Sequence, residues 1–187
     1  MTLKTLKENV LKMIEEISQT PNVYTDDPDI NEKLNTVINQ VMFELARMKK
    51  IPAQTTKTIT SSDNYFANLK TISNMYQIDH VRCVNANNEE VEFELFGYGL
   101  QTKEACTAYI YYYEYPTRIT SNTVDATYTF TLDDDVMEIL PYGVAADLLK
   151  SDVSANYGNV YAQRYETMLQ RLDYRYNQPM IYIETEV

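Results

Sequence analysis

The sequence has few of the residue types from which catalytic and metal sites are built. Among 187 residues there is no tryptophan, a single histidine, His80, and two cysteines, Cys83 and Cys106. The cysteines form neither a CxxC motif nor a cluster with metal-ligand spacing, which is typical of a protein from a reducing compartment. Motifs for phosphate cradles, dinucleotides and zinc proteases are missing as well. The sequence therefore predicts a protein that is not an enzyme and has no cofactor or metal site.

Basic residues and long apolar runs are also scarce. Sixteen lysines and arginines stand against 27 aspartates and glutamates, which gives a formal net charge of -11. Such a charge opposes the grip on a phosphate backbone that sequence-specific DNA binding requires. No apolar run is long enough for a signal peptide or a membrane span, so we expect a protein made in the cytoplasm with no membrane partner.

Two segments near the N-terminus have the spacing of amphipathic helices. In residues 3–17, apolar side chains recur every three or four positions, with Thr5 and Glu8 placed as a capping box for the helix start or its first turn. In the second segment, Asp27 is placed as the N-cap and Pro28 occupies the first helical position. An apolar stripe follows, and Pro52 prevents the helix from continuing.

Short runs rich in threonine, valine, isoleucine and tyrosine follow, separated by polar turns. This pattern predicts five or six strands that form a small sandwich or barrel. The turn "NANNEE" predicts an antiparallel hairpin between the strand that contains His80 and "EVEFELF". The alternation in "ATYTFTL" predicts another strand, with Tyr128, Phe130 and Leu132 on its buried face.

Helical spacing returns after residue 132. The acidic run Asp133–Asp135 is placed to cap a helix and to face its dipole, although three clustered carboxylates also suit a hard cation. Pro141 indicates either a fresh helix start or a separate preceding turn. A joint is expected near Gly158, followed by a last helix.

Together these elements predict an α+β fold. Residues 1–52 and 133–176 would form a helical bundle, into which residues 53–132 are inserted as a small antiparallel β lobe. Residues 177–187 are predicted to form an extended C-terminal arm, because Pro179 ends the helical pattern.

Two groups of residues are candidate contacts with a partner or a second subunit. The strand "TAYIYYYEYP" places a ladder of tyrosines on one face, and burial of both faces is the alternative. The C-terminal arm either completes the chain's own sheet or adds a strand to a neighbour. The candidate contacts are Tyr109, Tyr111, Tyr113 and Tyr115 in the strand and Met180, Ile181, Tyr182 and Ile183 in the arm.

His80 is the obvious candidate for a catalytic base. It lies on a predicted strand next to Asp79, whose side chain is expected on the opposite face of the sheet. We therefore expect His80 to be a solvated strand residue with no catalytic role.

Three sets of residues in the helical segments share a pattern with a known family. They are Asp27, Ile30, Leu34, Val37 and Val41; then Leu140, Pro141, Val144, Ala145, Ala146, Leu148 and Leu149; then Tyr161, Tyr165 and Leu169. This pattern resembles the head-to-tail connector, or adaptor, proteins of tailed bacteriophages. The larger members of that family are similar in having a β lobe between their helical parts.

The resemblance implies a structural virion protein of the neck. Such a protein is made in the host cytoplasm and forms a homo-oligomeric ring, typically of twelve subunits. The ring docks on the portal protein, binds tail or neck proteins, and lets DNA pass through its bore without sequence-specific binding. An acidic bore that repels phosphate suits this role.

Two other functions remain open. One is another virion neck or tail-completion ring protein, such as a tail terminator, which we expect to be mostly β. The other is a carbohydrate-binding module whose tyrosine ladder stacks on sugars. A sugar-cleaving enzyme of this kind needs a carboxylate pair, for which Glu92, Glu94 and Glu114 are the candidates.

Overall fold

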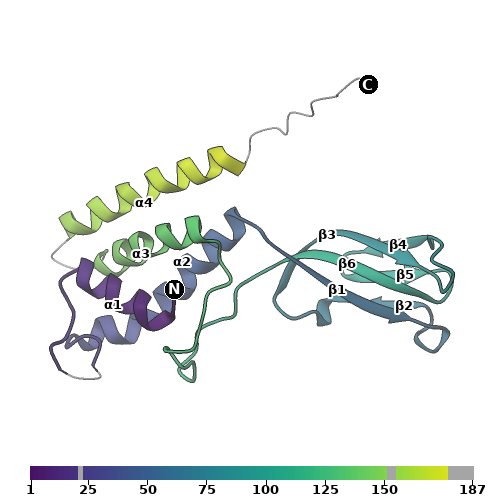
Figure 1. The fold of residues 1–187 in the computed structure, drawn as a ribbon, viewed down its shortest axis with the longest axis horizontal. Helices are drawn as coiled ribbons and strands as arrows, with labels where there is room; N and C mark the ends of the chain where they lie inside the picture. Colours follow the sequence, from purple (N-terminus) through teal and green to yellow (C-terminus); the bar gives the residue numbers. More distant parts are fainter. Residues whose placement is uncertain (21–22, 151–154, 177–187) are drawn as a thin grey trace. The chain divides into compact units, whose positions relative to one another are not determined.

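The computed structural model describes residues 1–20, 23–150 and 155–176, which form a mixed α+β structure (Figure 1). The chain divides into two compact units. One consists of Met1–Lys49 and Arg118–Val187, and the other is Lys50–Thr117. We call them the helical unit and the β unit.

The first two helices begin at side-chain caps. In α1, Leu3–Met13, the Thr2 hydroxyl accepts a hydrogen bond from the backbone N–H of Thr5 at 3.3 Å. The predicted capping box of Thr5 and Glu8 was therefore wrong, because Thr2 is the N-cap. In α2, Pro28–Met48, the carboxylate of Asp27 accepts hydrogen bonds from two backbone N–H groups of the first turn, at 2.8 and 3.2 Å, as predicted.

The later helices differ from the prediction at two positions. Pro141 lies inside α3, Asp134–Leu149, so neither a fresh start nor a separate turn occurs there. Gly158 lies inside α4, Ala155–Tyr176, and not at the joint. A Cβ at Gly158 would lie 3.2 Å from the Cβ of Leu149, so the glycine lets α4 pass close to the end of α3. Helix α3 packs against each of the other three helices (Figure 1).

The predicted strand "ATYTFTL" is not a strand. Apart from one isolated bridge between Thr129 and Thr2, residues 118–132 are irregular and belong to the helical unit. The predicted β lobe, residues 53–132, therefore extends too far. The alternation of buried side chains is nonetheless real, because this extended segment lies over helices; the Tyr128 hydroxyl, for example, is 3.7 Å from the Sδ of Met42.

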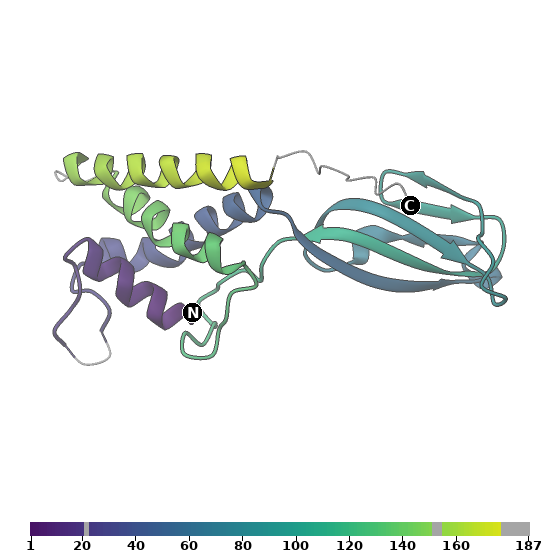
Figure 2. The same cartoon turned by 45° about the horizontal axis from the view of Figure 1, so that its top comes forward.

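The β unit consists of two antiparallel three-stranded sheets, with strand orders β1-β6-β3 and β2-β5-β4 (Figures 1 and 2). One apolar core contains residues from both sheets, including Ile59, Leu100 and Ile110. The described residues contain no closed barrel. The strands are β1 Ile51–Ile59, β2 Phe66–Asn68, β3 Met75–Val84, β4 Phe93–Phe96, β5 Gly99–Thr102 and β6 Cys106–Glu114.

The predicted hairpin after His80 forms only at its base. Val84 and Glu90 make an isolated antiparallel bridge, and the N–H of Val91 donates to the carbonyl of Cys83 at 3.0 Å. The chain then enters the other sheet, where β4 pairs with β5 across a turn that begins at Gly97, with φ of 60°.

None of the described helices is long and apolar enough to cross a membrane.

Candidate interaction surfaces

Strand β6 has one buried face and one face of half-buried tyrosines. Ala108, Ile110 and Tyr112 point into the core, as the alternation predicted. Because β6 is the central strand of its sheet, the tyrosines occupy the middle of the opposite face. We call this surface the tyrosine face. By the register of the strands it carries Tyr109, Tyr111 and Tyr113 on β6, Gln54 and Thr56 on β1, and Gln77, His80 and Arg82 on β3.

Asp79 lies on the same face as His80, contrary to the prediction. The register of β3 slips between Ile78 and His80, and this bulge brings both polar side chains to the tyrosine face. The Nδ1 of His80 is 2.8 Å from the Oδ2 of Asp79, and the Tyr113 hydroxyl donates to the Oδ1 at 2.9 Å. The His80 ring stacks on Tyr111 at a centroid distance of 4.1 Å.

These contacts set the electrostatics of the tyrosine face. The hydrogen bond from His80, followed by that from Tyr113, lowers the pKa of Asp79, while donation to Asp79 raises the pKa of Tyr113. The Nζ of Lys50 lies 4.7 Å from the centroid of the Tyr113 ring. The side chains of His80 and Asp79 are 59% and 44% exposed, so water reaches both. Stacking and hydrogen bonding to a polar partner suit this surface better than acid–base catalysis.

Tyr115 follows the end of β6 and continues the ladder. Its ring stacks on that of Tyr76 at 4.5 Å, and Tyr76 also approaches Tyr113 at 6.4 Å. All four tyrosines proposed from the sequence are half-buried, and Tyr111, Tyr113 and Tyr115 each contact another aromatic ring.

An acidic groove of about 560 Å³ lies along β4 and β5. Glu90, Glu92, Glu94 and Lys103 are among its lining residues, and Glu92 forms an ion pair with Lys103. Glu114, the third carboxylate considered for sugar cleavage, lies on β6 in the other sheet. The fold thus brings two of the three carboxylates to one groove.

The acidic run at the start of α3, Asp133–Asp135, pairs with a lysine. The Nζ of Lys49 lies 2.6 Å from a carboxylate oxygen of Asp133 and 3.1 Å from one of Asp135. Asp133 occupies the N-cap position, but its side chain makes no capping hydrogen bond. No group of three or more metal-ligating side chains occurs among the described residues.

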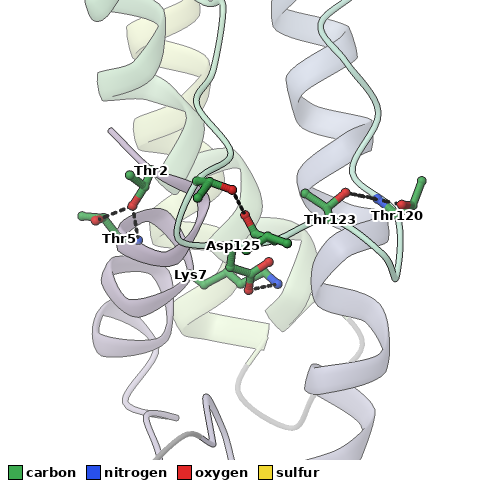
Figure 3. Close-up of polar contacts among 8 residues, drawn as sticks. Thr2, Thr5, Lys7, Thr120, Thr123 and Asp125 are labelled. Atoms are coloured by element: carbon green, nitrogen blue, oxygen red, sulfur yellow. Dashed lines mark hydrogen bonds and ion pairs between the residues drawn. The ribbon is translucent and has the colours of Figure 1, made fainter.

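A buried polar network ties the segment after β6 to the helices (Figure 3). Lys7, on α1, is 5% exposed and forms an ion pair with Asp125 at 2.7 Å. The Nζ of Lys7 also lies 5.1 Å from the centroid of Tyr24, and burial, followed by the hydrogen bond with Asp125, raises the pKa of Tyr24. Nearby, the Asn39 side chain exchanges two hydrogen bonds with the backbone of Ile119, at 2.8 and 2.9 Å.

The apolar stripe of α4 is incompletely covered. Leu172 is buried, but the other apolar residues on this side of the helix are only half-buried, although α4 packs along α3. The Tyr165 hydroxyl donates to Glu44 on α2 at 3.2 Å. The half-buried residues are Tyr161, Ala162, Tyr165, Met168 and Leu169.

Sequence reasoning missed Lys7, Lys50 and Arg82. These residues reach their contacts only through tertiary packing or through the register of the strands. Neither of these leaves a local pattern in the sequence. The candidate contacts in the C-terminal arm, Met180, Ile181, Tyr182 and Ile183, lie outside the described residues.

Comparison with models of known protein families gives no match, and no curated protein matches the chain significantly.

Proposed function

We propose that this chain is a structural virion protein, a head-to-tail adaptor that forms a ring on the portal and joins the capsid to the tail. The residues that resemble the adaptor family lie on α2, α3 and α4. Many of them, such as Leu34, Val41 and Leu140, are core residues that fix how the helices pack. These residues support a helical packing shared with the adaptor family. The argument for assembly into a ring rests instead on a surface of α4.

The observation that carries the proposal is the half-buried apolar stripe of α4. In a ring, one surface of each subunit packs against a different surface of the next. The α4 stripe supplies one surface that such a contact would cover, with Met168 and Leu169 at the C-terminal end of its half-buried residues. Removing this apolar area from water would favour association.

The acidity of the chain suits the passage of DNA. A net charge of -11 on every subunit repels phosphates, so DNA would move through the bore without sequence-specific contacts. The partners in this proposal are further copies of the chain, the portal protein and tail or neck proteins, and the location is the virion neck.

The balance of elements weighs against a tail terminator, which we expected to be mostly β. The described helices contain 11, 21, 16 and 22 residues, whereas the longest strand contains 10.

A carbohydrate-binding module is the second candidate, favoured by one observation. The stacked rings of His80 and Tyr111 lie beside amide side chains such as Gln54, a combination that suits sugars.

The test is the native mass of the full chain in dilute solution, repeated with portal rings and imaged by electron microscopy. A closed ring, alone or on the portal, is expected; a monomer indifferent to the portal would overturn the proposal.

Replacement of Met168 and Leu169 with serine should weaken the ring, and Val160→Ser, an exposed residue of the same helix, is the control. Retention on a glycan column that Tyr111→Ser abolishes and Tyr98→Ser preserves would favour the sugar-binding function instead.

A further inference from the structure

Strand β4 is the least protected sheet edge in the described β unit. Exposed edges normally carry features that prevent pairing with another chain, such as proline, lysine, bulges or short length. Edge strand β1 contains Pro52 and Lys57, and β3 is interrupted by two register shifts. Strand β2 has three residues, and the carbonyl of Asn68 accepts from the Nζ of Lys57 at 3.3 Å. Strand β4 is also short, with four residues, but it is paired on one side with β5 and contains no proline, lysine or register shift.

The side chains of β4 are apolar and exposed. Phe93, Leu95 and Phe96 are 37%, 41% and 71% exposed, and only Glu94 is charged. Leu95 pairs with Leu100, which is fully buried, so the inner face of the sheet continues to the β4 edge without being covered there. A strand added beside β4 would extend that core and satisfy the backbone groups of the edge.

We propose that residues 180–183 of a second copy add to β4 as a fourth strand of the β2-β5-β4 sheet. This inference rests on the proposed function, because the ring brings two copies together. The segment "MIYI" contains four apolar residues rich in β-branched and aromatic types, without glycine or proline. Its length matches the four residues of β4.

Charge sets the direction of the added strand. Glu90 and Glu92 precede β4, whereas Glu184 and Glu186 follow the apolar segment in the arm. An antiparallel strand would place the two acidic pairs side by side, and like charges opposite each other are destabilising. A parallel strand carries the acids of the arm past the turn at Gly97 and avoids this repulsion. Ile183 then lies near Phe96.

The test is disulfide mapping between two differently tagged full-length chains, one with Ile183→Cys and the other with Phe96→Cys or, in a parallel sample, Phe93→Cys, mixed and oxidised after assembly. Non-reducing gels and peptide mass spectrometry would show a link between the two tagged chains. The matched control replaces Phe66, an exposed residue of the opposite edge strand β2, with cysteine. We expect several-fold more linkage to position 96 than to position 66.

Each outcome decides one point. Rings that form without a preferred link to position 96 or 93 would overturn the inference and leave the proposed function intact. A preferred link to position 93 would overturn the parallel direction. A chain that carries both Ile183→Cys and Phe96→Cys is a further control: a link within that chain, with none between the two tagged chains, would overturn exchange between copies. If no ring forms under any condition, the proposed function fails as well.

A second measurement guards against misfolded variants. Leu95→Lys should reduce ring formation while circular dichroism stays unchanged, and Phe66→Lys should leave both unchanged. Equal assembly of the two variants would contradict the assignment of β4 as the docking edge.

Discussion

Gly143 lies where α2 and α4 both pack closely against α3, and its replacement tests the packing of the helical unit. A Cβ at this position would lie 2.6 Å from the Cγ1 of Val41 and 2.7 Å from the Cε2 of Tyr165. Alanine would gain about 1 kcal/mol in helix propensity. Forcing a methyl group into a packed contact costs about 1–3 kcal/mol, and both distances are far below normal contact. The cost should therefore lie in the upper part of that range, about 2–3 kcal/mol, and we expect Gly143→Ala to lower the free energy of unfolding by about 1–2 kcal/mol.

Urea unfolding followed by circular dichroism measures this change. Gly158→Ala is a matched control inside α4, because its added Cβ would meet Leu149 at 3.2 Å, where a small shift of the neighbour is enough. In a double-mutant cycle, Gly143→Ala should cost less when Val41 is already alanine, since the smaller side chain leaves room. An unchanged or raised stability of Gly143→Ala would refute the reasoning and would mean that α4 is not held firmly against α3.

Two further predictions concern buried polar groups of the helical unit. Asp125→Ala should lower the free energy of unfolding by about 3 kcal/mol, because it leaves the ammonium of Lys7 buried without its partner. Thermal unfolding measures this change. As a control, Asp29→Ala removes a carboxylate from an exposed ion pair and should cost less than about 1 kcal/mol. Burial raises the pKa of Tyr24 and Tyr165, so their contribution to stability is complete below the ordinary tyrosine pKa of about 10 and is lost as the pH rises above it. Urea midpoints measured on both sides of that pH should fall more steeply for the wild type than for the two Tyr→Phe variants, and equal slopes would contradict the assignment.

Local signals predicted the parts of the fold that local forces determine. The Asp27 cap and Pro28 fixed the start of α2, and alternation in β6 separated core residues from the tyrosine face. Strand partners were harder, because "NANNEE" forms a turn whether or not the following strand stays in the same sheet. The bulge beside Asp79 also has no signature of its own, so the Asp79–His80 contact required the structure.

The segment 118–132 shows the same limit from another side. Of its alternating side chains, Leu132 is buried as predicted, whereas Tyr128 and Phe130 are half-buried. Alternation reports only that one face of an extended chain is covered. A sheet and a group of helices produce the same pattern. Deciding between them requires contacts that are distant in sequence, such as that between Tyr128 and Met42.

The pairing of Ile51 with Glu114 joins the first residue of β1 to the last residue of β6. The β unit therefore enters and leaves the rest of the chain at neighbouring points, as a detachable module does. A short loop could therefore connect Lys49 to Arg118 in place of the β unit. The exact length of that loop would matter little, because the entropy of loop closure varies only slowly with loop length. Lineages could thus gain, lose or exchange this module while the helices keep their own packing. An engineered chain in which a short glycine–serine linker joins Lys49 to Arg118 would reproduce the loss of the β unit.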